Sequence, residues 1–186
     1  MTGLFRDLLQ RHFASPAYIE EPDLQDLIWS AGERTSILIE SAYRWRPELS
    51  QKRPAVIVKR NAYSKHRVGI NDQRLGNSVD EVGDPHFITY RVGSHTLFCL
   101  GGSAPQAELL ACEVERELEQ FGPVIRQILG LFRFEYQQTG PVAILEEAQE
   151  NFVVPVTFGY AYENRWAIRE QAPRLRSVSK TLLLQC

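Results

Sequence analysis

The stretch Gly101–Gly130, GGSAPQAELLACEVERELEQFGPVIRQILG, decides the fold because it is the only long helix that the sequence signals clearly. Ser103 and Gln106 form an S-x-x-Q capping box, in which each side chain satisfies a backbone donor at a helix start. Pro105 falls in the first turn, where the missing N–H of proline is harmless. Apolar residues then recur at helical spacing. They are Ala107, Leu110, Ala111, Val114, Leu118 and Phe121.

Gly122 and Pro123 interrupt this pattern, because proline clashes with the preceding turn of a helix. The apolar residues among 124–129 allow one or two more turns, and Gly130 suits the position just after a last turn. We therefore expect a helix over about residues 103–121 that is kinked there and continues to 129.

The opposite face of this helix is acidic and carries one arginine, Arg116. Its carboxylates belong to Glu108, Glu113, Glu115, Glu117 and Glu119. Two interpretations stay open: a core helix with a solvated acidic face, or an acidic face that lines or meets something specific. The helix alone does not decide between them.

Residues 1–35 predict an N-terminal helix followed by an arm. Apolar side chains between Gly3 and Phe13 recur at i, i+4 spacing, which indicates a short amphipathic helix that ends before Pro16. Residues 14–35 are interrupted by prolines and a glycine. Their apolar side chains need a surface, either the core of this domain or a neighbouring subunit.

Strand-like segments lie on both sides of the central helix, where β-branched and aromatic residues are frequent. The expected strands cover residues 36–45, 55–60, 87–100 with a hairpin turn at Gly93-Ser94, 131–136, 142–145, 152–162 and, after a turn at Glu163-Asn164, 166–168. Pro155 indicates an edge position or a bulge, since proline cannot donate to the ladder.

Two further segments are expected outside these strands. Residues 69–85 have turn chemistry throughout and predict a long loop, a kind of segment that is often functional or mobile. Residues 173–186 predict a C-terminal arm or edge strand. The whole pattern predicts one α+β domain over residues 1–186. Its mixed, largely antiparallel sheet would carry the long helix on one face, and a short helix would lie at the N-terminus.

Composition excludes several classes of protein. The chain has 186 residues, of which 44% are hydrophobic, and a formal net charge of -2, which argues against binding nucleic acid through bulk charge. It contains no apolar run long enough for a membrane span. The start of the chain lacks the features of a signal peptide, so we expect a cytosolic protein. The three cysteines, Cys99, Cys112 and Cys186, form no C-x-x-C pair and predict neither a disulfide framework nor a zinc site.

The search for catalytic chemistry finds no motif. His12, His66, His86 and His95 have no metal-ligand spacing, and no nucleophile elbow, P-loop or dinucleotide fingerprint is present. A Gly-Gly-Ser sequence precedes the central helix, whose start is able to bind an anion, but a tight turn with an N-cap accounts for it fully. The sequence therefore predicts no catalytic, cofactor or metal residue.

The second half of the chain contains an ordered series of segments. They are Tyr90-Arg-Val-Gly-Ser-His-Thr-Leu-Phe-Cys-Leu-Gly, the acidic helix Ala107–Phe121, Leu131-Phe-Arg-Phe, Ala143-Ile-Leu-Glu-Glu, Asn151-Phe-Val-Val-Pro-Val and Tyr160-Ala-Tyr-Glu-Asn-Arg-Trp-Ala-Ile. This series resembles the neck and tail-completion proteins of tailed bacteriophages, in particular the tail terminators. The resemblance covers roughly residues 87–168.

The resemblance implies a structural virion protein with no enzymatic activity or cofactor. Tail terminators form a ring, commonly a hexamer, at the head-proximal end of the tail tube, where they end tube polymerisation and join tail to head. The implied partners are further copies of the chain, the tail tube, the sheath protein and a head-side connector or stopper protein. Genome DNA would pass without specific binding, and no membrane is involved. The expected location is the virion neck, after assembly in the host cytoplasm.

Roles for particular residues follow from this ring. The acidic face (Glu108, Glu113, Glu115, Glu117 and Glu119) would line the lumen, where like charge keeps DNA from adhering. The residues expected at subunit or partner interfaces are Lys52, Arg53, Lys59, Arg60, Arg74, Asp80, Arg174 and Arg176.

Two alternatives remain. Within the same class, the chain fits another neck ring, a stopper or head-tail connector. From a different class, it fits a small-ligand-binding α+β module, which the Gly-Gly-Ser helix start favours and the lack of convergent polar groups disfavours.

Overall fold

The computed structural model describes residues 1–32, 35–46, 54–66, 74–79, 85–145 and 151–167. Within this part of the chain, three α-helices and two short 3-10 helices accompany eight strands, so the α+β class predicted from the sequence is confirmed. The helices are α1 (Thr2–His12), η1 (Pro16–Tyr18), η2 (Pro22–Leu24), α3 (Ala104–Gln120) and α4 (Gly122–Leu129). The strands are β1 (Leu38–Ser41), β2 (Ala55–Arg60), β3 (Ser64–His66), β4 (Arg74–Val79), β5 (Pro85–Gly101), β6 (Arg133–Thr139), β7 (Ala143–Ile144) and β8 (Phe152–Ala167).

The strands form one mixed sheet with the order β1-β2-β5-β8-β6. Among the described strands, only β1 and β2 pair in parallel, and the other pairs are antiparallel. Strands β3 and β4 pair with β5, and β7 pairs with β8. The prediction of a mixed, largely antiparallel sheet is therefore confirmed.

The local signals at the central helix are also confirmed. The Ser103 hydroxyl accepts a hydrogen bond from the backbone N–H of Gln106, as a capping box requires. The Gln106 side chain reaches back one residue further than usual, because its Oε1 accepts from the N–H of Gly102 at 2.9 Å. The kink at Gly122 separates α3 from α4, and Gly130 ends α4 with a positive φ of 60°.

The predicted hairpin at Gly93-Ser94 is wrong, because β5 is one continuous strand through both residues. Gly93 lies opposite Tyr160 of β8, and Ser94 lies opposite Gly159. The predicted turn at Glu163-Asn164 is wrong for the same reason, since β8 continues through it in register with β5. Pairing between distant segments overrides the local turn preference at both places.

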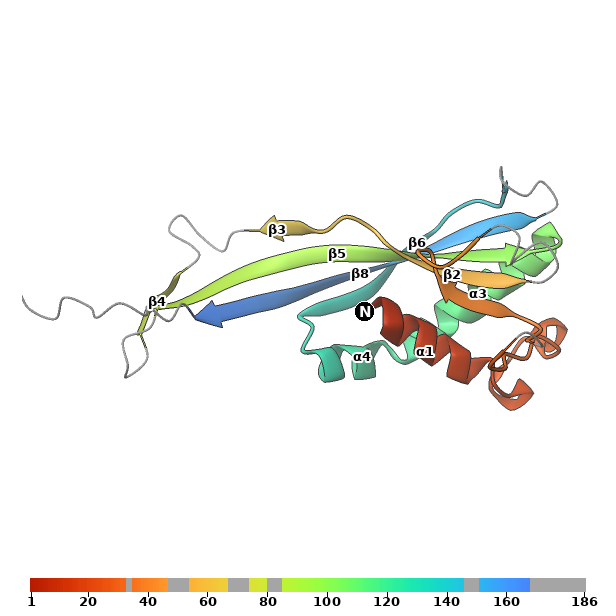
Figure 1. The fold of residues 1–186 in the computed structure, drawn as a ribbon, viewed down its shortest axis with the longest axis horizontal. Coiled ribbons are helices and arrows are strands. Elements are labelled where there is room, and N and C mark those ends of the chain that lie inside the picture. The colour runs from red at the N-terminus through yellow and green to blue at the C-terminus, as the bar shows by residue number, and fades with distance from the viewer. Residues whose placement is uncertain (33–34, 47–53, 67–73, 80–84, 146–150, 168–186) are drawn as a thin grey trace, which may run out of the picture.

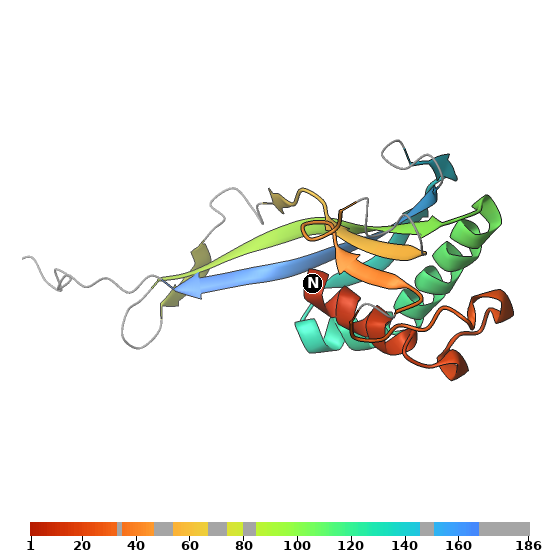
Figure 2. The ribbon, with the colours of Figure 1, turned by 45° about the vertical axis from the view of Figure 1, so that its right-hand side comes forward.

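Strands β5 and β8 extend beyond the part of the sheet that the helices cover. Figures 1 and 2 show them leaving the compact end of the molecule side by side. We call residues 85–92 of β5 and 161–167 of β8 the β-ribbon. Strand β3 pairs with the β-ribbon at Tyr90–Val92, and β4 pairs with it near its far end.

Pro155 lies in β8, which has neighbours on both sides, so an edge strand is the wrong description. The carbonyl of Pro155 accepts from the N–H of Gly140, just after β6 ends and before β7 begins. In an antiparallel strand the N–H and C=O of one residue point to the same side. The missing N–H of Pro155 therefore faces this interruption and removes no ladder bond.

The main core lies between the helices and one face of the sheet. Its fully buried side chains come from α1 (Phe5 and Leu9), α3 (Leu110, Val114 and Leu118) and the sheet (Val56, Leu97, Val156 and Phe158). Figure 2 shows α1 and α3 on the same side of the sheet. The predicted packing of the long helix on one face is confirmed. A smaller cluster of Ala55, Ile57, Leu100 and Val153 covers the other face.

Residues 14–32 pack onto this core as two 3-10 turns, with Ile19 and Leu24 buried. The expected loop 69–85 includes strand β4, so that expectation is wrong for residues 74–79, and residues 69–73 and 80–84 lie outside the described part. Residues 173–186, expected as an arm or edge strand, also lie outside it.

Candidate functional site

The expected acidic face of α3 is divided by the fold. Glu113 and Glu117 are buried, with exposed fractions of 1% and 8%, because α1 packs over them. The prediction that Glu113 and Glu117 belong to an exposed acidic surface lining a lumen is therefore wrong. Helix α1 covers both carboxylates and places His12 between them. Glu108 and Glu119 are exposed and Glu115 is half-buried, so these three keep their charges at the surface.

His12 of α1 lies between the two buried carboxylates. Its Nε2 is 2.7 Å from Oε1 of Glu113, and its Nδ1 is 3.0 Å from Oε2 of Glu117. Glu113 also accepts from the backbone N–H groups of Glu20 and Glu21 and pairs with Arg116. We call His12, Glu113, Glu117 and Arg116 the buried ion cluster.

Mutual attraction determines the charge state of this cluster. Burial alone would lower the pKa of His12, but the hydrogen bonds and charges of Glu113 and Glu117 raise it to about 9. Burial alone would raise the pKa of Glu113, but its bonds with His12, the Glu20 N–H and Arg116 lower it. The cluster therefore carries a protonated histidine and an ionised Glu113 at neutral pH.

The buried ion cluster has the residue types of an acid-base site but not the geometry. Both ring nitrogens of His12 are occupied by carboxylates, so neither is available to a substrate. The cluster joins α1 and the turns at residues 20–21 to α3, which is a structural role. Sequence reasoning missed it, although a histidine on the apolar face of the N-terminal helix was a signal.

The basic residues expected at interfaces fall into two groups. Lys59 and Arg60 end β2 and are exposed, on opposite faces of the sheet: Lys59 lies over the Phe98 ring, and Arg60 lies over the Tyr63 ring. Arg74 lies in β4, where only the backbone is described. The remaining predicted interface residues lie outside the described part of the chain: Lys52, Arg53, Asp80, Arg174 and Arg176.

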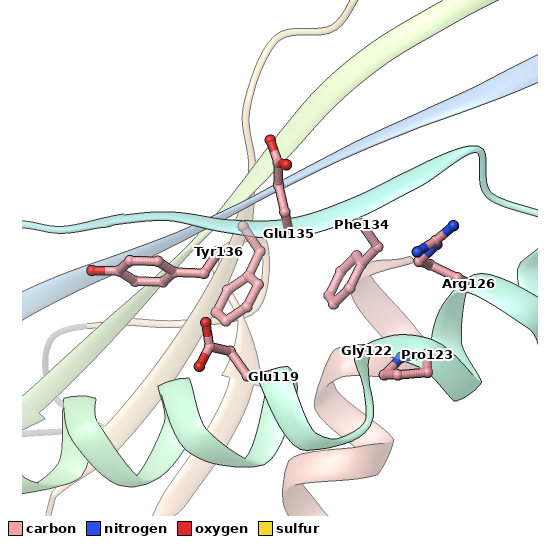
Figure 3. Close-up of a pocket in the computed structure, with 8 residues that line it drawn as sticks. Glu119, Gly122, Pro123, Arg126, Phe134, Glu135 and Tyr136 are labelled. Carbon is pink, nitrogen blue, oxygen red and sulfur yellow. The ribbon is translucent and has the colours of Figure 1, made fainter.

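Three of the cavities formed by the described residues lie beside the helices. The first, of about 440 Å³, separates the α3–α4 junction from β6 (Figure 3). Phe134 points from β6 toward Gly122 and Pro123, and its ring stacks on Phe158 with centroids 5.5 Å apart. None of the buried polar atoms found without a partner in the described residues belongs to this cavity. Its geometry therefore identifies no ligand.

The second cavity, of about 720 Å³, is a groove between α1, η1 and the α3–α4 junction. Apolar side chains with exposed surface line it, including Tyr18, Phe121 and Ile128. Arg11, Asp7 and Glu20 lie at the same groove. No group here converges on a single point, so the groove has the character of a contact surface.

The third cavity, of about 310 Å³, lies where the β-ribbon leaves the compact end of the molecule. It brings together Thr2 of α1, Arg60 of β2, His95 of β5 and Tyr160 of β8. The sequence predicted no catalytic or metal-binding role for His95 or Cys99. His95 is fully buried beside the first turn of α1, whereas Cys99 is a buried thiol whose pKa is raised by burial.

No group of three or more His, Cys, Asp or Glu side chains in the described part of the chain is able to hold a metal ion. Across the same residues, no helix combines the length and apolarity that a membrane crossing needs. Comparison with known proteins gives no family: no protein-family model matches the chain, and no curated protein matches it significantly.

Proposed function

We propose that this chain is a structural virion protein that forms a ring at the head-proximal end of a phage tail tube. There it would end tail polymerisation and join the tail to the head, as a tail terminator does. The β-ribbon is the observation that carries the proposal. The resemblance of residues 87–168 to tail-completion proteins supports it independently.

A ribbon of this kind needs a partner surface. Two paired strands alone are marginally stable in water, because they bury little apolar area. In the β-ribbon, β3 and β4 add pairing only over short stretches of β5. Side chains at its root remain open to solvent, with Val92 39% exposed and Tyr63 50% exposed. A neighbouring copy that covers this surface would stabilise the β-ribbon.

The position of the β-ribbon favours a ring over a two-fold dimer. It projects from one end of the molecule, while the helices lie at the other (Figure 1). A contact between unlike surfaces of successive copies is heterologous, and such contacts close into rings when the rotation allows. In such a contact the β-ribbon of one copy would meet a different surface of the next copy.

Charge supports the same arrangement. The surface of α3 presents Glu108, Glu115 and Glu119, and the end of β2 presents Lys59 on the face of the sheet away from α3. Surfaces of opposite sign steer two copies together and fix their register. The three surface carboxylates of α3 remain candidates for the lumen or for this contact, whereas Glu113 and Glu117 belong to the buried ion cluster.

The test is assembly in solution. The mass of the purified chain is measured alone and with tail-tube protein, and both samples are imaged by negative stain. Rings of the free chain, or caps at tube ends that limit tube growth, would support the terminator proposal. A chain that ignores tubes but binds a head-side connector would instead be a stopper or connector.

A further inference from the structure

The cavity at the root of the β-ribbon has an unusual set of walls. Its volume of about 310 Å³ lies at the lower end of the range of small-ligand pockets, roughly 300–1,000 Å³. One wall is apolar and consists of Met1, Leu129 and Leu131. The polar groups come from four elements that are far apart in the sequence: Thr2, Arg60, His95 and Tyr160.

The start of α1 reaches this cavity through Met1 and Thr2. The first intrahelical bond runs from the N–H of Phe5 to the carbonyl of Met1, so the N–H groups of residues 2–4 have no helical acceptor. Among the side chains of the described residues, none caps this helix start. The aligned peptide dipoles make it positive, which favours an anion there.

His95 is an observation at this cavity that is independent of the helix start. Its side chain is fully buried and lines the cavity, and its Nε2 lies 2.9 Å from Oγ1 of Thr2. Its Nδ1 has no hydrogen-bond partner in the described part of the chain. A buried polar atom without a partner is costly, and native structures contain few of them.

The surroundings of His95 are positive. Burial lowers the pKa of His95 to about 4, and the charges of the amino terminus and Arg60 act in the same direction. Arg60 and Arg91 both lie over the Tyr63 ring, at 5.7 and 5.4 Å. No carboxylate of the described residues pairs with either guanidinium. Arg60, which lines the cavity, is therefore a cation that an anion bound there would neutralise.

Tyr160 completes the arrangement, and Gly93 makes room for it. A Cβ at Gly93 would lie 2.7 Å from the Tyr160 hydroxyl, so the ring crosses β5 only because residue 93 is glycine. The Tyr160 ring lies 5.4 Å from His95 and is stacked with Tyr162 at 6.3 Å. Two aromatic rings thus adjoin the positive groups.

We propose that this cavity binds a small ligand with a phosphate group, held by Arg60, the start of α1 at Thr2 and the Tyr160 hydroxyl. A guanidinium and the backbone of a helix start together suit the oxygen atoms of a phosphate group. The tyrosine rings and the apolar wall leave room for a small aromatic or apolar portion. The inference does not depend on ring assembly.

Isothermal titration calorimetry of the full chain tests this site, with inorganic phosphate, phenyl phosphate and acetate as probes at constant ionic strength. Phosphate and phenyl phosphate are expected to bind saturably at one site, with phenyl phosphate tighter. Acetate binding as tight as phosphate would overturn the assignment of a phosphate group. The absence of saturable phosphate binding below about 10 mM would overturn the site itself.

Arg60→Gln is expected to weaken phosphate binding by about tenfold or more, because it removes a charged donor. Lys59→Gln is the matched control, since Lys59 is the neighbouring cation on the opposite face of β2. It is expected to change the affinity less than about twofold. Equal weakening by both variants would show diffuse charge attraction and overturn the site. Arg60 is exposed, and a melting curve of each variant establishes that it is folded. Tyr160→Phe, which keeps the ring, provides a second variant expected to weaken binding.

Discussion

His12 Nε2 lies 2.7 Å from Oε1 of Glu113, although 101 residues separate them in the sequence. This contact joins the N-terminal helix to the central helix inside the core. It explains why two carboxylates of an apparently solvated helix face are buried. It also makes the stability of the fold dependent on one histidine.

Replacing His12 by alanine should lower the free energy of unfolding by about 3–5 kcal/mol, because it leaves buried carboxylates without their partner. Urea unfolding measures this change. Arg11→Ala, which changes the exposed neighbouring residue, is the control and should shift stability by less than about 0.5 kcal/mol. Adding Glu113→Gln and Glu117→Gln to the His12 variant should restore part of the loss. A loss no larger than that of the control would refute the buried ion cluster as a stabilising feature.

Stability should fall at alkaline pH. The folded pKa of His12, about 9, exceeds its ordinary value of 6.5, so the native state holds the proton more tightly. The contribution is complete below pH 6.5 and is lost as the pH rises through 9. The difference between these two pKa values corresponds to about 3 kcal/mol of folding stability, at roughly 1.4 kcal/mol per pKa unit. The free energy of unfolding is measured between pH 6 and 10, an interval that includes this pKa. It should decline with pH in the wild type and change less in His12→Ala. Parallel profiles would contradict the assignment.

Gly101→Ala should destabilise the fold by about 1–3 kcal/mol, as overpacking of a rigid site does. A Cβ at residue 101 would lie 2.7 Å from the backbone nitrogen of Ala107, in the first turn of α3. Backbone of a helix start is unable to move aside without displacing α3. At Gly102 the nearest atom is the flexible end of Gln106, 3.8 Å away, so Gly102→Ala should be nearly neutral. Thermal melts of the two variants compare them directly, and equal effects would count against this packing.

Reversing the charges on either of the two surfaces should block ring assembly, and mixing the two variants should restore it. One variant carries Glu108→Lys, Glu115→Lys and Glu119→Lys, and the other carries Lys59→Glu, which reverses the cation on the face of the sheet away from α3. Each alone presents two surfaces of like charge at a head-to-tail contact and should fail to form rings. Mixed in equal amounts, they should form alternating rings, since each contact again joins opposite charges.

Light scattering and negative stain measure this outcome. The unreversed chain at the same salt concentration is the reference, and melting curves of both variants establish that they are folded. Rings formed by either variant alone, as readily as by the reference, would show that these charges do not lie at the contact.

The sequence predicted those features that depend on neighbouring residues. The Ser103 cap, the kink at Gly122 and the end at Gly130 are local, so the limits of the central helix were predictable. The continuity of β5 was not, because the turn preference of Gly93-Ser94 is overridden by pairing with β8 more than sixty residues away.

The candidate sites were less predictable than the fold. The burial of Glu113 depends on His12, and the cavity at the root of the β-ribbon joins Thr2, Arg60, His95 and Tyr160 from four separate elements. Helical periodicity identifies a polar face but does not show which part of it a second helix will cover. Contacts of this kind become visible only when the chain is folded.

The measurement that tests the central proposal most directly is the mass of the purified chain in solution, alone and with tail-tube protein, combined with negative-stain images. The account predicts rings, or caps that end tube growth, with the β-ribbon at the contact between copies. A chain that stays monomeric and leaves tube length unchanged would contradict it.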